Sequence, residues 1–189
     1  MNTGIKTNSK LAAATVTKMA LFIALMIVSG IVSIPLPVIG VPIVLQNMMI
    51  MLCGGFLGKK YGTLTNGLFL LLVFVGLPLL AGGRGGAAVF LSLSSGFLVG
   101  YLLCPLLINL FLQYLGDDHF WKIFLAYFIG GALVIDFMGS LSMAYYSHVS
   151  WAAGLKMVAV FLPMDTVKVV LATIIHQRLR KFTVAGNRG

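Results

Sequence analysis

The fold class is decided by the last apolar stretch of the chain, FLPMDTVKVVLATIIHQRLRKF (residues 161–182). From Pro163 onward this stretch has the roughly 20 residues that a membrane-spanning helix needs. Proline suits the first turn of such a helix. The two charged side chains near the start are Asp165 and Lys168, and a basic cluster begins at Arg178. The stretch therefore predicts a spanning helix with its basic end in the cytoplasm.

The composition of the whole chain indicates the same class. Of 189 residues, 60% are apolar, while 13 are basic and only four are acidic. A soluble domain is about 45–50% apolar and about 25% charged, so these few charges cannot build a water-facing surface. We therefore expect a polytopic membrane protein in contact with the lipid bilayer. A soluble enzyme and a nucleic-acid-binding domain are excluded despite the net charge of +9.

Six apolar segments predict six membrane-spanning helices in an all-α fold, forming one membrane-embedded domain over residues 1–189. We interpret the short apolar stretch at 151–162 as a re-entrant or surface helix, because it is too short to span. Cys53 and Cys104 lie inside apolar runs and are expected to be buried apolar residues, with no metal site. The predicted spans are about 11–34, 43–57, 61–80, 90–115, 121–146 and 163–182.

The positions of the basic residues predict the orientation. An even number of spans puts both termini on one side, and ten of the 13 basic residues fall on that side. By the positive-inside rule, both termini are cytoplasmic and the protein lies in the cell membrane. The ten are Lys6, Lys10, Lys18, Lys59, Lys60, Lys122, Arg178, Arg180, Lys181 and Arg188.

Few charges remain for the outer half of the bilayer. The acids are Asp136 and Asp165, which a helical rise of 1.5 Å per residue places roughly 21 and 24 Å above the cytoplasmic helix ends. The bases are Arg84, Lys156 and Lys168. A charge at the centre of a spanning helix costs about 2.5–3.5 kcal/mol, so such residues usually face a cavity or a partner.

Asp165 and Lys168 form the strongest local signal. They are three residues apart and share one helix face, and Asp165 falls in the first turn, where the helix dipole favours a carboxylate. One interpretation is a ligand site, in which the carboxylate accepts N–H donors and the ammonium meets a ligand carboxylate. The other is a self-satisfied ion pair that fixes the start of the helix.

Two connections on the outer side have unusual compositions. In PLPVIGVPIVLQ (residues 35–46), the prolines forbid helix, and the stiff apolar loop is either a lid over a site or a loop packed on helix ends. In GLPLLAGGRGG (residues 76–86), glycines such as Gly83 flank Arg84. Exposed backbone N–H groups there can bind an anion together with Arg84, or the segment is a flexible turn whose arginine meets lipid phosphate.

Polar and small residues inside the predicted spans give further candidates. Gln46 and Asn66 can bond between helices or reach a ligand. Tyr146 belongs to an aromatic belt at the membrane interface and can also pack on a ligand. Ala20 and Ala24 place two small residues on one face of the first helix, suited to close contact with a helix of this chain or of a partner.

Several of these segments, in order, carry a resemblance to a known family. PLPVIGVPIVLQ, GLPLLAGGRGG, SLSSGFLVGY and FLPMDTVKV, on a background of six spans, resemble the BioY family over roughly residues 12–182. BioY proteins are the biotin-specific substrate-capture (S) components of energy-coupling-factor (ECF) transporters. The resemblance implies no enzymatic activity and no bound cofactor. It also implies partners, namely one transmembrane coupling subunit and two ATP-binding subunits, with docking through Ala20 and Ala24.

The chemistry of biotin suits the candidate residues. Asp165 is expected to accept the ureido N–H groups, Gln46 or Asn66 to pair with the ureido carbonyl, and Arg84 or Lys168 to meet the valerate carboxylate. Two alternatives remain open. One is a self-sufficient secondary transporter for biotin or another small vitamin, and the other is an intramembrane enzyme using Ser94 with His148.

Overall fold

The computed structural model of the chain describes residues 3–31, 33–34 and 42–180. Most of these residues are helical, which confirms the all-α prediction. β1 and β2 form a two-residue antiparallel pair, in which Ser33 faces Val44 and Ile34 faces Ile43. The elements are α1 (Thr3–Ile31), β1 (Ser33–Ile34), β2 (Ile43–Val44), α2 (Gln46–Phe74), the 3₁₀ helix η1 (Ala87–Leu91), α3 (Ser95–Leu115), α4 (Phe120–Tyr127), the π-helix η2 (Phe128–Leu133), α5 (Val134–Tyr146), α6 (Trp151–Ala159) and α7 (Leu162–Leu179).

Helix α2 consists of two helices that meet at a break. Gly58 has φ 80° and ψ −179°, a conformation that glycine adopts without steric cost. The predicted second and third spans are the two parts of α2, so each of the six predicted segments contains a helix. The boundaries differ at the predicted outer side, where the third helix ends at Phe74 rather than near residue 80, and α3 begins at Ser95 rather than near residue 90.

Three uninterrupted helical stretches in the described part of the chain are long and apolar enough to cross a membrane. They are Ala13–Ile31, Ser95–Leu115 and the continuous α4–η2–α5 stretch Phe120–Tyr146. A fourth candidate is the pair formed by α6 and α7, which is bent by 55°. The predicted re-entrant or surface segment thus contains a separate short helix, α6. These stretches make the chain a multi-pass membrane protein.

The helices approach closely where glycines face a neighbouring backbone. A Cβ atom on Gly100 of α3 would lie 2.8 Å from the Cα of Ile135 in α5, and one on Gly130 of η2 would lie 2.7 Å from the backbone N of Ile108 in α3. Small residues at such contacts let membrane helices pack backbone to backbone. Cys53 and Cys104 are fully buried in the core, as predicted.

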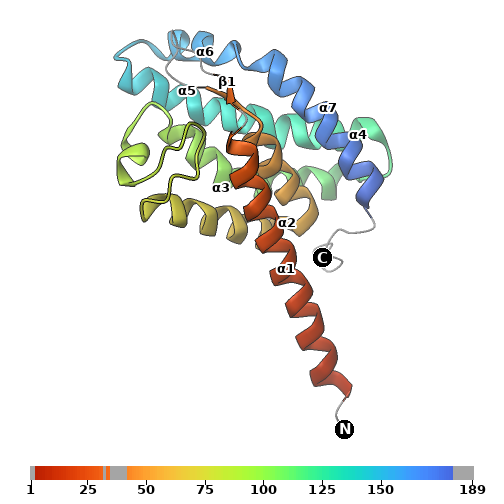
Figure 1. The fold of residues 1–189 in the computed structure, drawn as a ribbon. Helices are drawn as coiled ribbons and strands as arrows, with labels where there is room; N and C mark the ends of the chain where they lie inside the picture. Colours follow the sequence, from red (N-terminus) through yellow and green to blue (C-terminus); the bar gives the residue numbers. More distant parts are fainter. Residues whose placement is uncertain (1–2, 32, 35–41, 181–189) are drawn as a thin grey trace.

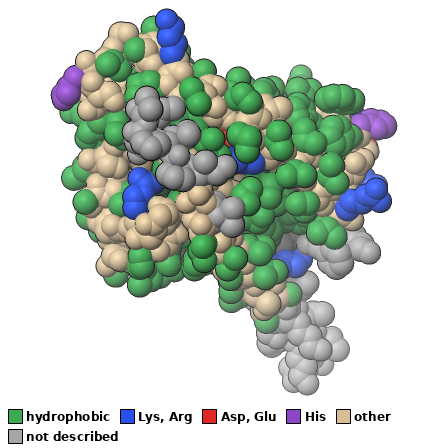
Figure 2. Space-filling model, turned by 45° about the horizontal axis from the view of Figure 1, so that its top comes forward, with side chains coloured by type: hydrophobic (Ala, Val, Ile, Leu, Met, Phe, Trp, Pro, Cys, Tyr) green, Lys and Arg blue, Asp and Glu red, His purple; other side chains and the backbone are tan. Residues whose placement is uncertain are grey.

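The surface of the helix bundle is largely apolar, as expected of a chain that faces lipid. Hydrophobic side chains cover much of the face shown in Figure 2, and the basic side chains lie scattered over it. On α1, Val28 and Ile31 are largely exposed, while Met19 and Met26 face the core. The hydrophobic effect therefore cannot by itself hold the helices together inside the bilayer, and close packing and buried polar contacts contribute instead.

The two ends of the bundle differ in character (Figure 1). The turn between α3 and α4 and the end of α7 lie at one end, where a guanidinium N–H of Arg180 donates to the carbonyl of Asp117 at 3.4 Å. The connection 75–94 and helix α6 lie at the opposite end. This second end, which the distribution of basic residues predicts to be the outer one, carries the cavity described next.

Candidate functional site: a cavity with charges at both ends

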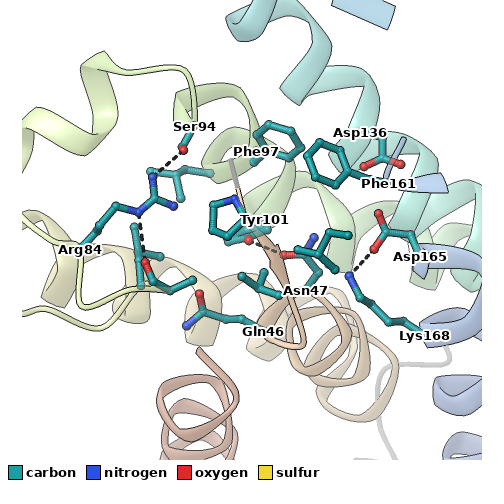
Figure 3. Close-up of a pocket in the computed structure, with 16 residues that line it drawn as sticks. Gln46, Asn47, Arg84, Ser94, Phe97, Tyr101, Asp136, Phe161, Asp165 and Lys168 are labelled. Carbon is teal, nitrogen blue, oxygen red and sulfur yellow. Dashed lines mark hydrogen bonds and ion pairs between the residues drawn. The ribbon is translucent and has the colours of Figure 1, made fainter. Parts of the chain in front are cut away.

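A cavity lies between α2, α3, α5 and α7 at the predicted outer end (Figure 3). It is partly open, and its free volume is only about 40 Å³, so the side chains that line it leave little empty space. The predicted lid loop lies mostly outside the described residues, but its last part contributes to the wall. The lining residues are Pro42, Ile43, Val44, Gln46, Asn47, Leu80, Ala81, Arg84, Ser94, Phe97, Leu98, Tyr101, Asp136, Phe161, Asp165 and Lys168.

Asp165 and Lys168 form an ion pair at one end of the cavity. The Nζ of Lys168 lies 2.6 Å from Oδ1 of Asp165, and both residues are only 3% exposed. Asp165 stands in the first turn of α7, after Pro163, as predicted, and its backbone N–H donates to the carbonyl of Phe161 at 2.9 Å. The residues therefore pair with each other, as one interpretation of the sequence pattern has it, and they also line a cavity, while the ligand contacts of the other interpretation stay a prediction.

Asp136 brings a second carboxyl group to the same end. It projects from α5 toward Asp165 of α7 (Figure 3), and it is only 6% exposed. Its atom Oδ2 is buried and has no hydrogen-bond partner among the described residues. The helical rise predicts a similar depth for Asp136 and Asp165, but Asp136 is not among the predicted site residues.

Arg84 stands at the other end of the cavity, on a tight turn. The backbone of Leu80 pairs with that of Arg84, and Gly82 and Gly83 between them have φ of 73° and 70°, which favours glycine at both positions. The guanidinium group is held by two bonds, from Nε to the carbonyl of Ala81 at 3.1 Å and from a terminal N–H to Oγ of Ser94 at 3.1 Å. The planar fork retains further N–H groups that can pair with a carboxylate.

Gly83 therefore acts as a turn residue in the structure. It is exposed and does not line the cavity. Its positive φ shapes the turn that presents Arg84. The predicted role of Gly83, in which its backbone binds an anion together with Arg84, therefore differs from its place in the structure. A side chain at Gly83 would be strained by this φ even though the surrounding space is open.

Gln46 lines the cavity but has already used its donors. Its Nε2 donates to the carbonyl of Met26 at 2.8 Å and to that of Leu79 at 2.9 Å. An amide NH₂ has only two N–H groups, so the side chain ties α1 and the 75–94 connection to α2 and keeps only its oxygen for a ligand. The predicted hydrogen bond from Gln46 to a carbonyl group of the ligand is therefore wrong. The only free hydrogen-bonding atom of Gln46 is its side-chain oxygen, which accepts and cannot donate.

Two other predicted site residues lie away from the cavity. Asn66 is fully buried between α2 and α3, where its Nδ2 donates to the carbonyl of Tyr101 at 2.8 Å. Asn66 therefore bonds to the backbone of Tyr101, a residue that lines the cavity, and does not itself reach the cavity. Tyr146 ends α5 and packs edge to face on Tyr145, with ring centroids 5.1 Å apart, and it does not line the cavity. Its place fits the interfacial belt.

The walls between the two charged ends are aromatic, and their residues are not among the predicted site residues. Phe97 and Phe161 meet edge to face with centroids 6.0 Å apart. The hydroxyl of Tyr101 donates to Oδ1 of Asn47 at 2.5 Å. The available signal was SLSSGFLVGY, in which Phe97 and Tyr101 are four residues apart and so share a helix face.

The arrangement does not assemble the pair expected of an intramembrane enzyme. Ser94 lines the cavity and accepts a hydrogen bond from Arg84, whereas His148 is exposed beyond the end of α5 and does not line the cavity. No group of histidine, cysteine and acidic residues suited to a metal ion occurs in the described part of the chain.

The geometry defines a class of protein. A membrane-embedded cavity with aromatic walls, an acidic and ammonium cluster at one end and a guanidinium group at the other suits a small elongated solute with an apolar middle. The polar groups of such a solute would be a hydrogen-bonding head and an anionic tail. The fold and the cavity together are those of a multi-pass membrane protein that binds a small molecule.

Comparisons with known proteins identify the family. The profile of the BioY family matches residues 4–184, so the chain belongs to the BioY family. The biotin transporter BioY of Lactococcus lactis subsp. cremoris (strain MG1363) is 40% identical over 172 residues, which cover 88% of this chain and 90% of the relative. The biotin transporter BioY of Thermotoga maritima is 34% identical over 168 residues, covering 88% and 96%.

A solved structure has the same fold. The 2.1 Å crystal structure of the S-component for biotin from an ECF-type ABC transporter superposes with a TM-score of 0.85 at 38% sequence identity. The match covers 96% of this chain and 95% of the other.

Proposed function

We propose that this chain is the biotin-binding S-component of an ECF-type vitamin transporter. The observation that carries the proposal is the separation of charges in the cavity, with Asp165 and Lys168 at one end and Arg84 at the other (Figure 3). Biotin has a matching separation of groups, with a ureido ring at one end and a carboxylate at the other. The family membership and the biotin S-component that shares the fold support the same ligand.

The two ends divide the recognition of biotin between them. The ureido ring lies at the Asp165 end, where the carboxylate accepts an N–H and the ammonium of Lys168 donates to the ureido carbonyl. The valerate carboxylate pairs with Arg84 rather than with Lys168. Lys168 is already bound to Asp165 at the opposite end of the cavity, where the ureido ring lies. The fused ring and the acyl chain lie against Phe97, Tyr101 and Phe161.

Calorimetry of the purified protein against a panel of vitamins tests this function. Biotin should bind, and an analogue without the ureido group should be rejected strongly, because the buried polar groups would then stay unpaired. Tight binding of a different vitamin together with no heat on addition of biotin would contradict the proposal.

The energy for transport comes from partners in this proposal. The chain is expected to dock on one transmembrane coupling subunit, which in turn carries two ATP-binding subunits. Ala20 and Ala24 are exposed on the same face of α1 and offer a smooth surface for another helix. Ala20→Trp and Ala24→Trp should therefore reduce co-purification with the coupling subunit and leave biotin affinity near normal.

A variant on a neighbouring face of α1 provides the control. Leu25 is also exposed, but it lies about 140° around the helix from Ala20 and about 100° from Ala24, so Leu25→Trp should leave complex formation intact. Equal loss of the complex in both variants would contradict the assignment of the face. Biotin uptake by this chain alone in vesicles without ATP-binding partners would favour the alternative, a self-sufficient secondary transporter.

A further inference from the structure

Asp136 is a buried acidic residue of the cavity whose role is not explained by the fold. Its Oδ2 has no hydrogen-bond partner among the described residues, although the side chain is only 6% exposed. Buried polar atoms in proteins are nearly always paired, and a buried carboxyl group is costly without a partner. An unpaired oxygen on the wall of a ligand cavity is therefore an acceptor site for a group that the ligand brings.

The shape of the α4–η2–α5 helix turns Asp136 toward the cavity. The buried positions Tyr127, Gly131, Ile135 and Gly139 recur every four residues. In a regular α-helix, four residues exceed one turn by about 40°, so this pattern would drift around the helix. The π-helix η2 is wider and takes up the drift, as π-turns at functional sites often do. Asp136, directly after Ile135, thereby stays on the inner face.

The neighbours of Asp136 show how local this orientation is. Leu133 precedes it by three residues and Phe137 follows it directly, and they are 36% and 44% exposed at the apolar surface. A rotation of α5 by one residue would carry the carboxyl group toward lipid. The close contact between Gly130 and the backbone of Ile108 holds the helix in place next to α3.

Asp136 and Asp165 present two carboxyl groups side by side at the same end of the cavity (Figure 3). In Asp165, Oδ1 is bound to Lys168, whereas in Asp136 the unpaired atom is Oδ2. A ureido ring carries two N–H donors, one on each side of its carbonyl group. Two neighbouring carboxyl groups can each accept one of these two donors, so a single aspartate does not have to accept both.

We propose that Asp136 is a second recognition residue for the ureido group, accepting one of its N–H donors while Asp165 accepts the other. This inference rests on the proposed function, because it takes biotin as the ligand. It adds a residue on α5 to a ureido site that otherwise belongs to α7. Specificity for the intact ureido ring then depends on the relative position of two helices.

The test measures, by calorimetry, the affinity of the full chain in detergent for biotin and for two derivatives. Each derivative is methylated on a different ureido nitrogen. Asp136→Leu should lower biotin affinity at least about 30-fold, and Asp136→Asn, which retains an acceptor oxygen, about 3- to 10-fold. The wild type should bind both methylated biotins poorly, because each has lost one N–H donor, either to Asp136 or to Asp165. Asp136→Leu should not further weaken the binding of the derivative that has lost the donor to Asp136. It should further weaken the binding of the other derivative.

Ser140→Ala provides the matched control on the same helix. Ser140 is fully buried one turn beyond Asp136, but its hydroxyl donates to the carbonyl of Phe137 and it does not line the cavity. This variant should bind all three ligands like the wild type. If Asp136→Leu does not yield a monodisperse protein, the same comparison is made with Asp136→Asn, which preserves the shape of the side chain.

Two results would overturn the inference while leaving the proposed function standing. One is unchanged biotin affinity in the Asp136 variants. The other is an equal loss for biotin and both methylated derivatives, which indicates a structural role without a contact to a particular N–H. Failure of the wild type to bind biotin would overturn the proposed function itself, and this inference with it.

Discussion

The two ends of the cavity are built in different ways. At one end, Asp165, Lys168 and Asp136 project from the helices α7 and α5, and they are almost completely buried. At the other end, Arg84 projects from a turn with two glycines at positive φ and is partly exposed. Helix packing thus fixes the positions of the charged groups at one end. At the other end, the position of the guanidinium group depends on a turn and on two hydrogen bonds that Arg84 donates.

This difference has consequences for recognition. A polar group on packed helices keeps its position, so it can discriminate between ligands that differ by one donor or acceptor. A cation on a turn adapts more easily and serves mainly to neutralise a charge. We therefore expect the helical end to carry specificity for the ureido ring, while the Arg84 end accommodates the acyl chain and its carboxylate. The following predictions test this division, from the largest expected effect to the smallest.

The largest effect is expected at Asp165. Asp165→Leu leaves the ammonium of Lys168 buried without its partner, a change that costs about 3–5 kcal/mol when one member of a buried pair is removed. Biotin affinity should fall by at least about 100-fold, and the melting temperature should fall as well. Calorimetry and thermal unfolding measure both. Thr166→Ala, whose hydroxyl bonds only to its own helix at Leu162, is the control, and biotin affinity within threefold of wild type in Asp165→Leu would count against this assignment.

A smaller effect is expected at the loop end. Arg84→Met should weaken biotin binding by about 10- to 100-fold, corresponding to the loss of about 1.5–3 kcal/mol from a hydrogen bond to a charged group. The same variant should bind biotin amide, which lacks the negative charge, almost as well as the wild type does. Lys156→Met removes an exposed basic side chain of α6 as a control. Equal losses for biotin and its amide would show that Arg84 does not meet the carboxylate.

Ser94 should matter less, because it acts through Arg84. Ser94→Ala removes one of the two bonds that hold the guanidinium group, and we expect a 2- to 5-fold loss of biotin affinity, the equivalent of about 0.5–1 kcal/mol. The neighbouring Ser95 does not line the cavity, so Ser95→Ala should change nothing. A loss in Ser94→Ala that persists when Arg84 is already Met would show that Ser94 acts independently of Arg84.

The smallest effect on the ligand is expected at the opposite end of the bundle. The hydrogen bond from Lys122, followed by one from the backbone, holds the pKa of Asp118 below its ordinary value. Because this pKa is lowered in the folded state, the interaction favours folding above the unfolded pKa and is lost as the pH falls through the folded one. In Lys122→Met the pKa of Asp118 should rise, as an NMR titration can measure, while biotin affinity stays unchanged.

Sequence reasoning located some parts of the site and missed others for physical reasons. Asp165, Lys168 and Arg84 were identifiable because charged residues in a membrane are rare and need a cavity or a partner. Aromatic residues such as Phe97 and Tyr101 were not, because aromatic side chains are common throughout the chain and face lipid, core or ligand alike. Asn66 was placed wrongly, since an amide in a spanning helix satisfies a neighbouring backbone as readily as it binds a ligand.

The sequence by itself determined the class of protein, the six helical segments and the identity of the outer charges, because the cost of burying charge in lipid restricts where each type of residue can lie. Only the tertiary structure decided which of these residues meet. The break at Gly58, the wide turn at η2 and the glycine contacts between α3 and its neighbours set the rotation of each helix. Rotation depends on packing between segments far apart in the chain, and it is this rotation that brings Asp136 to Asp165 and leaves Arg84 at the opposite end of the cavity.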